Sequence, residues 1–300
     1  MPRKLKMAKP SFTAFLIPKI LPALARNKKY SSLLTQQQVE LSRRFAKECA
    51  KNDFGIALVN LIGKRPAIWL ADNIGIKGLP VHYAARKRYI RDKLDSVISE
   101  LQQVVMIGAG FDTLCLEYSQ KYSEIKFFEI DQYATQKIKL DALIKMPGSV
   151  AQNMNFVAAD LSKQSVSAAL VPSGFNKNAK TFFVIEGVLP YLETKDVEKL
   201  FADIGFSCDG GSYIVFGSMS ELHTKNNLRA RFSDATLAVK KEKYKFAAPT
   251  KDIQEMLKRA GFKLSETKLY HELQQEIESP EKIKILAGER GEHYYFAIRG

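Results

Sequence analysis

The stretch VVMIGAGFDT, residues 104 to 113, decides the fold of this chain of 300 residues. An apolar run from Val104 to Ile107 breaks into Gly-Ala-Gly and then into an Asp-Thr pair that is suited to opening a helix. A short apolar run bounded by turn residues is typical of a strand buried on both faces of a sheet. The stretch predicts a strand, a tight turn and a helix. It leaves open whether the turn binds phosphate, binds another cofactor or only connects two elements.

Downstream of this stretch, short β-rich runs alternate with helical patterns. The strand-like runs are 102–108, 124–131, 155–160, 180–187, 211–218, 262–270 and 292–299. The helical patterns are 112–122, 133–146, 194–205 and 250–260. Alternation of this kind predicts an α/β fold with a doubly wound, Rossmann-like sheet.

The first third of the chain has a different pattern. Residues 31–100 are mainly helical in pattern, as in 35–50 and 83–102, with Gly- and Pro-containing joints near 63–66 and 75–80. Helices placed before the first strand are suited to covering the carboxyl ends of the strands, where ligands bind in such sheets. We therefore expect an N-terminal arm and helical cap over 1–100 and a cofactor-binding core over 101–300.

Composition excludes several classes of protein. The chain is 46% hydrophobic and 26% charged, and no run approaches the roughly 18 to 20 apolar residues of a membrane span. The three cysteines, Cys49, Cys115 and Cys208, are odd in number and lack CxxC spacing. This pattern indicates a cytoplasmic protein in a reducing compartment, with no disulfide framework and no metal site.

The net charge of +14 is concentrated in two segments. Residues 1–30 hold eight basic residues and no acid, residues 223–251 hold eight basic and two acidic residues, and the rest is balanced. Such segments attract phosphates, anionic lipid or an acidic substrate, or are solvated surface charge. Without a recognised RNA-binding module, nucleic acid is a disfavoured but open partner. The basic N-terminus favours an arm that packs on the domain over a targeting peptide, because prolines interrupt its apolar half.

The turn itself does not suit a diphosphate. A dinucleotide turn has the form GxGxxG, but Thr113 occupies the third glycine position, and no GK[ST] follows for a Walker A loop. Asp112 in the turn would also repel a diphosphate. S-adenosylmethionine fits better, because its sulfonium and ammonium groups need close backbone approach and nearby acids. A purely structural glycine turn is the alternative.

Acidic residues end the next three strand-like runs. Glu129 and Asp131 end the second run, where a carboxylate can accept hydrogen bonds from ribose hydroxyls. Asp160 ends the third run and is suited to receive an adenine amino group. Glu186 ends the fourth, otherwise apolar run, where a carboxylate is costly unless it is paired or solvated. Each acid alone could be a solvated strand end; together they predict a binding site.

The motifs resemble those of the leucine carboxyl methyltransferase family, which also includes bacterial polyketide-type O-methyltransferases. The resemblance covers roughly residues 84–220. The matching segments, in family order, are AARKRYIRDKL (84–94), VVMIGAGFDT (104–113), FFEIDQYATQKIKL (127–140), ADL (159–161) and FFVIEGVLPYL (182–192). It implies an S-adenosylmethionine-dependent class I methyltransferase fold, with a mostly parallel sheet whose last strand is antiparallel.

The resemblance also implies a set of cofactor-binding residues. Arg86 would bind the methionine carboxylate and Glu186 the ammonium group. The turn of Gly108, Ala109 and Gly110 would surround the methionine part. Asp131 would hold the ribose, and Asp160 with Leu161 the adenine. Arg43 is a weaker candidate for a second cation near the site.

The methyl acceptor stays open at this stage. We expect O-methylation of a small acidic or hydroxylated molecule, with a substrate lid inserted at about 220–250. The alternatives are a protein carboxyl group, RNA, or a non-catalytic S-adenosylmethionine-binding module. A carboxylate acceptor needs no base, whereas a hydroxyl acceptor needs one; His82, His223 and Tyr191 are possible bases. A lone His or Tyr is more often structural, so the sequence assigns no catalytic residue and no oligomeric state.

Overall fold

The computed structural model describes residues 14, 18–19, 21–22, 24–26, 31–52, 79–220, 244–277 and 292–300. The expected joint near 63–66 and most of the expected lid at 220–250 lie outside the described residues. The same holds for most of the two basic segments.

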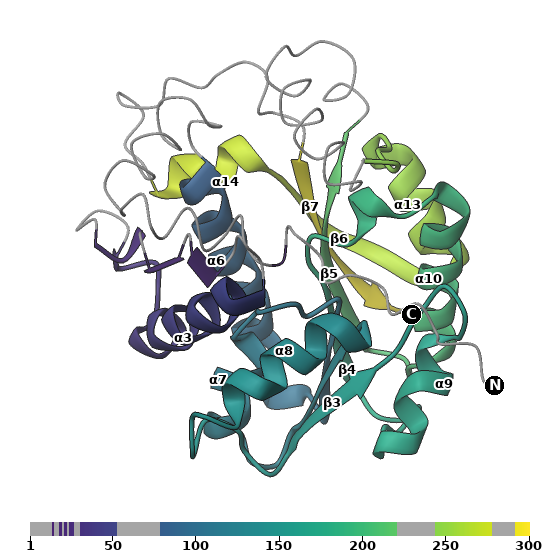
Figure 1. Ribbon diagram of the computed structural model, residues 1–300. Helices are drawn as coiled ribbons and strands as arrows, with labels where there is room; N and C mark the ends of the chain where they lie inside the picture. The colour runs from purple at the N-terminus through teal and green to yellow at the C-terminus, as the bar shows by residue number, and fades with distance from the viewer. Residues whose placement is uncertain are drawn as a thin grey trace, which may run out of the picture.

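Within the described residues, seven strands form one sheet in the order β3-β2-β1-β4-β5-β7-β6 (Figure 1). Strands β1 to β5 pair in parallel; in β1, Val105 lies beside Phe128 on one side and Phe183 on the other. Strand β7 is antiparallel to both β5 and β6. This confirms the predicted doubly wound, mostly parallel sheet with an antiparallel last strand. The strands are β1 (Gln103–Ile107), β2 (Lys126–Asp131), β3 (Met154–Ala158), β4 (Thr181–Ile185), β5 (Tyr213–Met219), β6 (Phe262–Leu269) and β7 (Glu292–Arg299).

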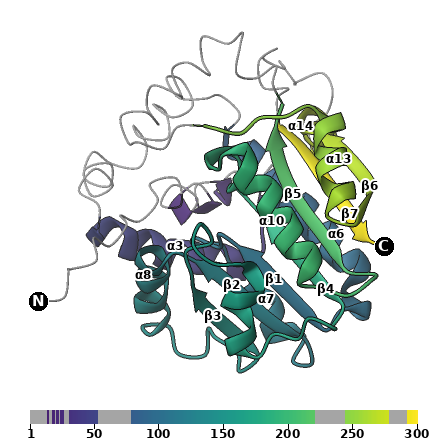
Figure 2. The same ribbon diagram turned by 90° about the vertical axis from the view of Figure 1, so that its right-hand side faces the viewer.

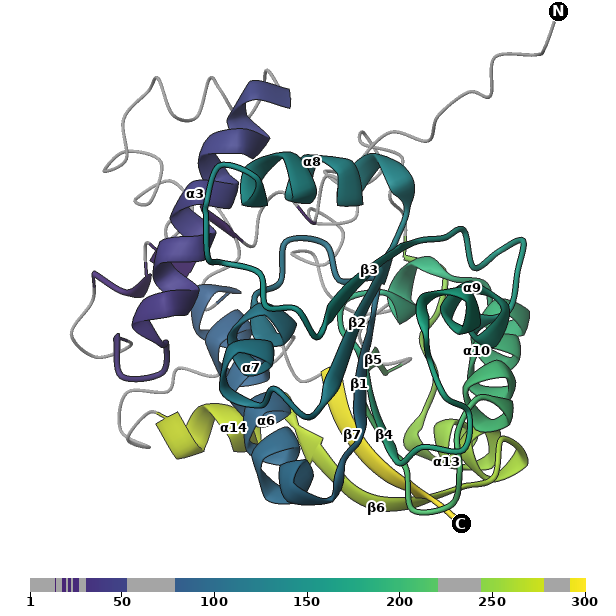
Figure 3. The same cartoon turned by 90° about the horizontal axis from the view of Figure 1, so that it is seen from below.

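Helices cover both faces of the sheet (Figure 3). One face carries α3 (Gln36–Asn52), α6 (Leu79–Val97), α7 (Leu114–Lys121), α8 (Tyr133–Leu143) and α14 (Tyr270–Ile277). The other carries α9 (Val166–Leu170), α10 (Thr194–Phe206) and α13 (Thr250–Arg259), and Figure 2 looks onto this side. Short 3-10 turns are η1 (Ile98–Glu100), η2 (Val171–Ser173) and η3 (Leu189–Tyr191).

The apolar strand runs separate the two core clusters. Val104 and Met106 belong to the cluster beneath α6 and α7, whereas Val105 and Ile107 belong to the cluster beneath α10 and α13. All four side chains are almost fully buried. Burial of one such side chain stabilises the fold by about 1.5–3 kcal/mol, which explains why strands buried on both faces have continuous apolar sequences.

The sequence was least informative at the edge of the sheet. Strand β6 pairs within the described sheet only with β7, and most of its residues are half-buried. A register shift between Leu264 and Glu266 further interrupts its alternation. Helix α14 follows β6 without a break and was not predicted, nor was α9, which is only 5 residues long. Short elements carry too few periodic positions for a pattern to emerge.

The described N-terminal residues pack on the domain. Leu21 and Leu24 are buried in a small cluster with Ala84 of α6. Ala14 packs against the main core beside the turn after β1. Helix α6, which belongs to the expected N-terminal cap, lies in the helix layer on one face of the sheet, beside α14. None of the helices in the described ranges is long and apolar enough to cross a membrane.

Candidate functional site

The turn after β1 lies where the strand order reverses, between β2 and β4, which is where ligands bind in open α/β sheets. Gly108 and Gly110 have φ angles of +68° and +49°, in the left-handed region that side chains disfavour. A Cβ atom on Gly108 would also clash with the side chain of Val188. The backbone N–H groups of Gly108 and Ala109 donate to the Ile130 carbonyl at 2.8 and 3.1 Å. The turn is therefore tied to β2 and needs glycine at its first position.

Asp131 holds the same turn from the end of β2. Its carboxylate accepts hydrogen bonds from the backbone N–H groups of Gly110 and Gln132, at 2.5 and 2.6 Å. Burial raises the pKa of this half-buried carboxyl, although both hydrogen bonds act in the opposite direction. Glu129, the other acid of this strand end, is 1% exposed and pairs with Lys139 at 2.6 Å. Of the two acids, Asp131 is the partly exposed one and is the last residue of β2.

Asp160 and Leu161 follow β3 at the same edge. The Asp160 carboxylate accepts from the Ser162 hydroxyl and pairs with Lys163, both at 2.6 Å. The bond from Lys163 is the main reason why the pKa of Asp160 is lowered. Leu161 packs against the core beneath α10. Asp160 is thus in the predicted place, but its carboxylate is bound within its own loop.

The largest unexpected feature is a buried charge network, which we define as His82, Arg86, Lys87, Asp112, Glu186 and Glu292. Arg86 of α6 donates from Nε to Glu186 after β4 at 2.9 Å, and its Nη1 lies 3.7 Å from Glu292 at the start of β7. Lys87 donates to the second Glu186 oxygen at 2.7 Å and pairs with Asp112 of the turn. The six side chains form one chain of alternating charge in which His82 contacts Glu292.

Burial shifts the acid–base equilibria of this network. Desolvation alone would lower the pKa of Arg86, but the charges of Glu186 and Glu292 outweigh it and raise the pKa. Desolvation lowers the pKa of Lys87 to about 8, although the charge of Glu186 opposes this. Desolvation alone would raise the pKa of Glu292, but His82 and Arg86 bring it to about 2. Arg86 therefore stays charged between its two carboxylates, Glu186 and Glu292.

Asp112 does not have the role that the sequence suggested. We expected its carboxylate to face a bound cofactor and repel a diphosphate. Instead it is buried, pairs with Lys87 and accepts from the backbone N–H of Leu114 at 2.6 Å. Its charge therefore anchors the turn to α6 and to the start of α7. The argument against a diphosphate now rests on the missing third glycine, whose position Thr113 occupies.

The sequence pointed to Arg86 and Glu186 as site residues. It did not point to Lys87 and Glu292, which complete the network. Arg43, the weaker candidate, lies on α3 with a side chain 54% exposed and pairs with Glu40, whereas Lys87 is the cation that contacts Glu186 beside Arg86. A signal for Glu292 was present. It opens the last strand, and the start of an antiparallel strand lies at the same edge as the carboxyl ends of its parallel neighbours.

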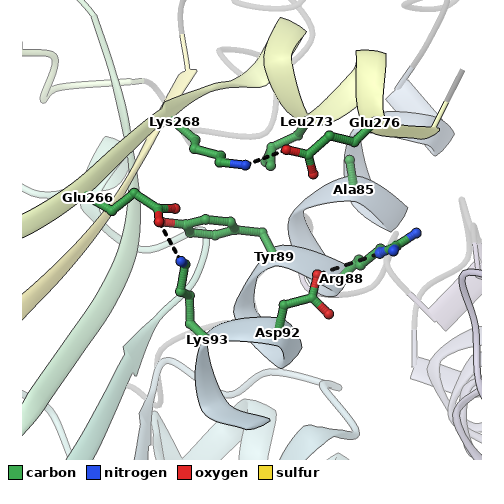
Figure 4. A pocket seen from close by; sticks show the side chains of 9 residues that line it. All are labelled: Ala85, Arg88, Tyr89, Asp92, Lys93, Glu266, Lys268, Leu273 and Glu276. Atoms are coloured by element: carbon green, nitrogen blue, oxygen red, sulfur yellow. Dashed lines mark hydrogen bonds and ion pairs between the residues drawn. The ribbon is translucent and has the colours of Figure 1, made fainter. Parts of the chain in front are cut away.

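A second group of charges surrounds a cavity of about 70 Å³ beside α6 (Figure 4). It is lined by three bases and three acids, and Lys93 pairs with Glu266 at 2.6 Å and Arg88 with Asp92 at 3.5 Å. Small-molecule sites usually have about 300–1,000 Å³. This cavity holds a few water molecules at most, so it is not a cofactor site. The described residues also contain no cluster of His, Cys, Asp and Glu that could hold a metal ion.

Comparison with known proteins identifies related sequences. A family model described as leucine carboxyl methyltransferase matches residues 40–205, more than half of the chain. YktD of Bacillus subtilis, which carries the name of an S-adenosyl-L-methionine-dependent methyltransferase, is 32% identical over 138 residues, or 46% of this chain and 45% of that protein. A Mycobacterium ulcerans protein with the same kind of name is 30% identical over 140 residues, or 47% and 46%. The chain spans about half the length of the curated relatives it matches.

Solved structures show the same fold at lower identity. A crystal structure of a DUF574 family protein from Streptomyces avermitilis has a TM-score of 0.57 and 13% identity, covering 75% of this chain and 86% of that chain. An S-adenosylmethionine-dependent methyltransferase from Mesorhizobium loti has a TM-score of 0.54 and 15% identity, covering 72% and 98%. These likenesses support the class I methyltransferase fold.

Proposed function

Because this chain belongs to the leucine carboxyl methyltransferase family, we propose that it is an S-adenosylmethionine-dependent methyltransferase that methylates an oxygen of a small acidic or hydroxylated molecule. The observation that carries the proposal is the buried Arg86–Glu186 ion pair beside the glycine turn. The sequence contains no recognised RNA-binding module, which supports a small acceptor over RNA. The three cysteines are free thiols, which supports a cytoplasmic location.

The Arg86–Glu186 pair suits the amino-acid end of the cofactor. A carboxylate can replace Glu186 on the guanidinium, and an ammonium group can replace Arg86 on the Glu186 carboxylate. Each buried charge then keeps a partner, which avoids the large cost of an unpaired buried ion. In this proposal Arg86 binds the methionine carboxylate and Glu186 the ammonium group. Lys87 stays on Glu186 and holds it in position.

The remaining parts of the site match the rest of the cofactor. Gly108, Ala109 and Gly110 let the methionine part approach the backbone closely, and Asp131 has a half-buried carboxylate for the ribose hydroxyls. Asp160 and Leu161 would border the adenine, after Asp160 exchanges its bonds within the loop.

The bound cofactor supplies an electrophilic methyl group on a sulfonium. The protein's contribution to such an in-line displacement is alignment of the two reactants and exclusion of water. In this proposal the Arg86–Glu186 pair would hold the amino-acid end of the cofactor, Asp131 the ribose, and Asp160 with Leu161 the adenine end. These residues all lie at the carboxyl edge of the parallel strands, so an acceptor would be aligned with the cofactor at that edge.

Isothermal titration calorimetry tests cofactor binding. We expect S-adenosylhomocysteine to bind and NAD to give no comparable heat. Glu186→Gln should weaken S-adenosylhomocysteine by about 10- to 100-fold, because a hydrogen bond to a charged group is worth about 1.5–3 kcal/mol. Glu198→Gln is the control, because Glu198 forms an exposed pair with Arg259. Binding of NAD without S-adenosylhomocysteine would overturn the proposal.

A transfer assay tests the acceptor. Methyl-tritiated S-adenosylmethionine is incubated with the protein and with cell extract divided into small-molecule, RNA and protein fractions. We expect label in the small-molecule fraction. Label only in RNA or protein would contradict the small acceptor, and label in none would favour a non-catalytic binding module.

A further inference from the structure

His82 and Glu292 form an imidazole–carboxylate pair at the end of the buried charge network. Nε2 of His82 contacts Oε2 of Glu292, and the hydroxyl of Tyr294 donates to the same oxygen at 3.1 Å. Arg86 lies 3.7 Å from the other Glu292 oxygen. Glu292 is therefore held by groups from both α6 and β7, and it in turn fixes the orientation of the imidazole.

This contact determines which imidazole nitrogen is free. A carboxylate accepts a hydrogen bond, so Nε2 carries the proton and Nδ1 keeps its lone pair in the neutral ring. No hydrogen bond to Nδ1 from the described residues is present, and 18% of the side chain is exposed. The pair has the composition of a general base with a carboxylate behind it.

The pair also lies beside the proposed cofactor site. His82 precedes Arg86 by one helical turn, so both side chains are on the same face of α6. Arg86 bridges the two acids of the network, since it contacts Glu186 on one side and Glu292 on the other. A single guanidinium therefore separates the imidazole–carboxylate pair from the residue proposed to hold the cofactor's ammonium group.

Aromatic rings surround the imidazole. The ring of Tyr270 lies 4.5 Å from it, Tyr83 5.9 Å and Tyr294 6.4 Å, measured between centroids. The guanidinium of Arg86 lies 4.7 Å from the Tyr83 ring centroid. Such surroundings favour a flat, aromatic acceptor over a strongly hydrated one. The Glu292 carboxylate against His82 also disfavours an acceptor whose reacting group is itself a carboxylate.

We propose that His82 is the general base of the reaction and that the methyl acceptor is an aromatic hydroxyl compound, with Glu292 as the residue that positions His82. This rests on the proposed methyltransferase function. The acceptor hydroxyl gives its proton to Nδ1, and its oxygen forms a bond to the methyl carbon. The carbon–sulfur bond breaks, its electron pair stays on sulfur, and the imidazolium later releases the proton to solvent. The negative charge of Glu292 stabilises the imidazolium.

The experiment compares His82→Gln with wild type in the tritium assay on the small-molecule fraction. The glutamine amide can still donate to Glu292 but offers no basic nitrogen. We expect transfer to fall by about 100-fold or more, as for loss of a general base, with the affinity for S-adenosylhomocysteine unchanged within about twofold. His271→Gln on α14 is the matched control and should retain full activity. Equal activity of His82→Gln and wild type would overturn the proposal.

Treatment of the labelled product with mild alkali identifies the acceptor group. A methyl ester is hydrolysed and releases volatile labelled methanol, whereas an aryl methyl ether is stable. Stable label supports the proposal. Volatile label would overturn the hydroxyl acceptor while leaving the methyltransferase function intact. No label in any fraction, with S-adenosylhomocysteine bound, would overturn catalysis itself and with it the role of His82.

The pH profile separates a base from a purely structural residue. The groups that face His82 are Glu292 and Tyr294 of β7, Tyr270 of α14, and Tyr83 and Arg86 of α6. With His82 as base, the rate rises tenfold per pH unit while the imidazole is protonated and then levels off. Glu292→Gln should lower the transfer rate but keep a pH step, because the amide holds the imidazole less firmly than the carboxylate does. A transfer rate equal to wild type would contradict the positioning role of Glu292.

Discussion

Helix α6 carries two groups of charged residues on two of its faces. The groups have the same residue types but differ in how deeply they are buried. On the inner face, Arg86 and Lys87 pair with Glu186, and the three side chains are only 6–7% exposed. On the outer face, Arg88 pairs with Asp92 at the rim of the small cavity, and these side chains are 51% and 59% exposed (Figure 4). Exposed pairs are worth about 0–1 kcal/mol, whereas an unpaired buried charge costs several.

The difference shows what distinguishes a candidate binding site from a surface with exposed charged side chains. Water can replace either partner of an outer pair, so those charges place little constraint on their neighbours. The inner charges are almost closed to water, and among the described residues their charged partners are one another. A network of this kind is stable only while every member is held in place, so a ligand that displaces one member must supply a charge of the same sign.

The largest expected effect is that of Arg86→Met. The change leaves Glu186 and Glu292 without the cation between them, so unfolding free energy should fall by about 3–5 kcal/mol and S-adenosylhomocysteine affinity by about 100-fold or more. Arg88→Met, two residues further on the outer face, should change stability by less than about 0.5 kcal/mol. Urea denaturation and calorimetry measure both quantities. Similar losses in the two variants would remove the distinction between the faces.

The second prediction concerns acid stability. The pKa of Glu292 is lowered from 4.5 to about 2 in the folded protein. As the pH falls, this carboxyl is therefore protonated in the unfolded chain before it is protonated in the folded one. The corresponding stabilisation, about 3 kcal/mol, is complete above pH 4.5 and is lost as the pH falls through 2. The advantage of wild type over Glu292→Gln should therefore shrink as pH decreases from 5 to 3. In the outer group, Glu276→Gln should differ from wild type by less than about 1 kcal/mol throughout. A constant advantage over Glu292→Gln would contradict the assigned pairing.

A smaller effect is expected for Gly108→Ala at the turn. Both a positive φ angle and a clash with Val188 oppose a side chain there. Gly148→Ala is the control, because Gly148 also has a positive φ, +78°, but has no atom within 4 Å of the added carbon. We expect about 1 kcal/mol of destabilisation at Gly148 and about 1–3 kcal/mol more at Gly108, measured by urea denaturation. Equal destabilisation by the two substitutions would show that the Val188 side chain moves aside without a measurable loss of stability.

The smallest effect is expected for Asp131→Asn. The amide oxygen can still accept the hydrogen bond from Gly110, so the turn should keep its shape. Loss of the charge should weaken S-adenosylhomocysteine by about fivefold, or about 1 kcal/mol. Asp141→Asn, in an exposed pair on α8, is the control and should bind like wild type. Calorimetry that finds no change at Asp131 would argue against its contact with the ribose.

The sequence predicted the sheet well because its strands are buried on both faces. Continuous apolar runs and the turn at Gly108 are local signals, and the acids Asp131 and Glu186 stand out because each ends such a run. The buried charge network has no local signal. Lys87 looks like any helix cation until Asp112 and Glu186 are brought to it. Contacts between residues that are far apart in the sequence depend on the assembled sheet, and no pattern along the chain reports them.

The position of β7 between β5 and β6 has a consequence for the order of assembly. Strand β6 precedes β7 in the chain but hydrogen-bonds within the described sheet only to it. During synthesis, residues 262–269 therefore leave the ribosome before their partner exists. An unpaired strand of this kind is exposed to wrong pairing with other chains. The same insertion delivers Glu292 to its place beside Arg86, so the segment that completes the sheet also completes the charge network, and we expect both to form in one late, concerted step of folding.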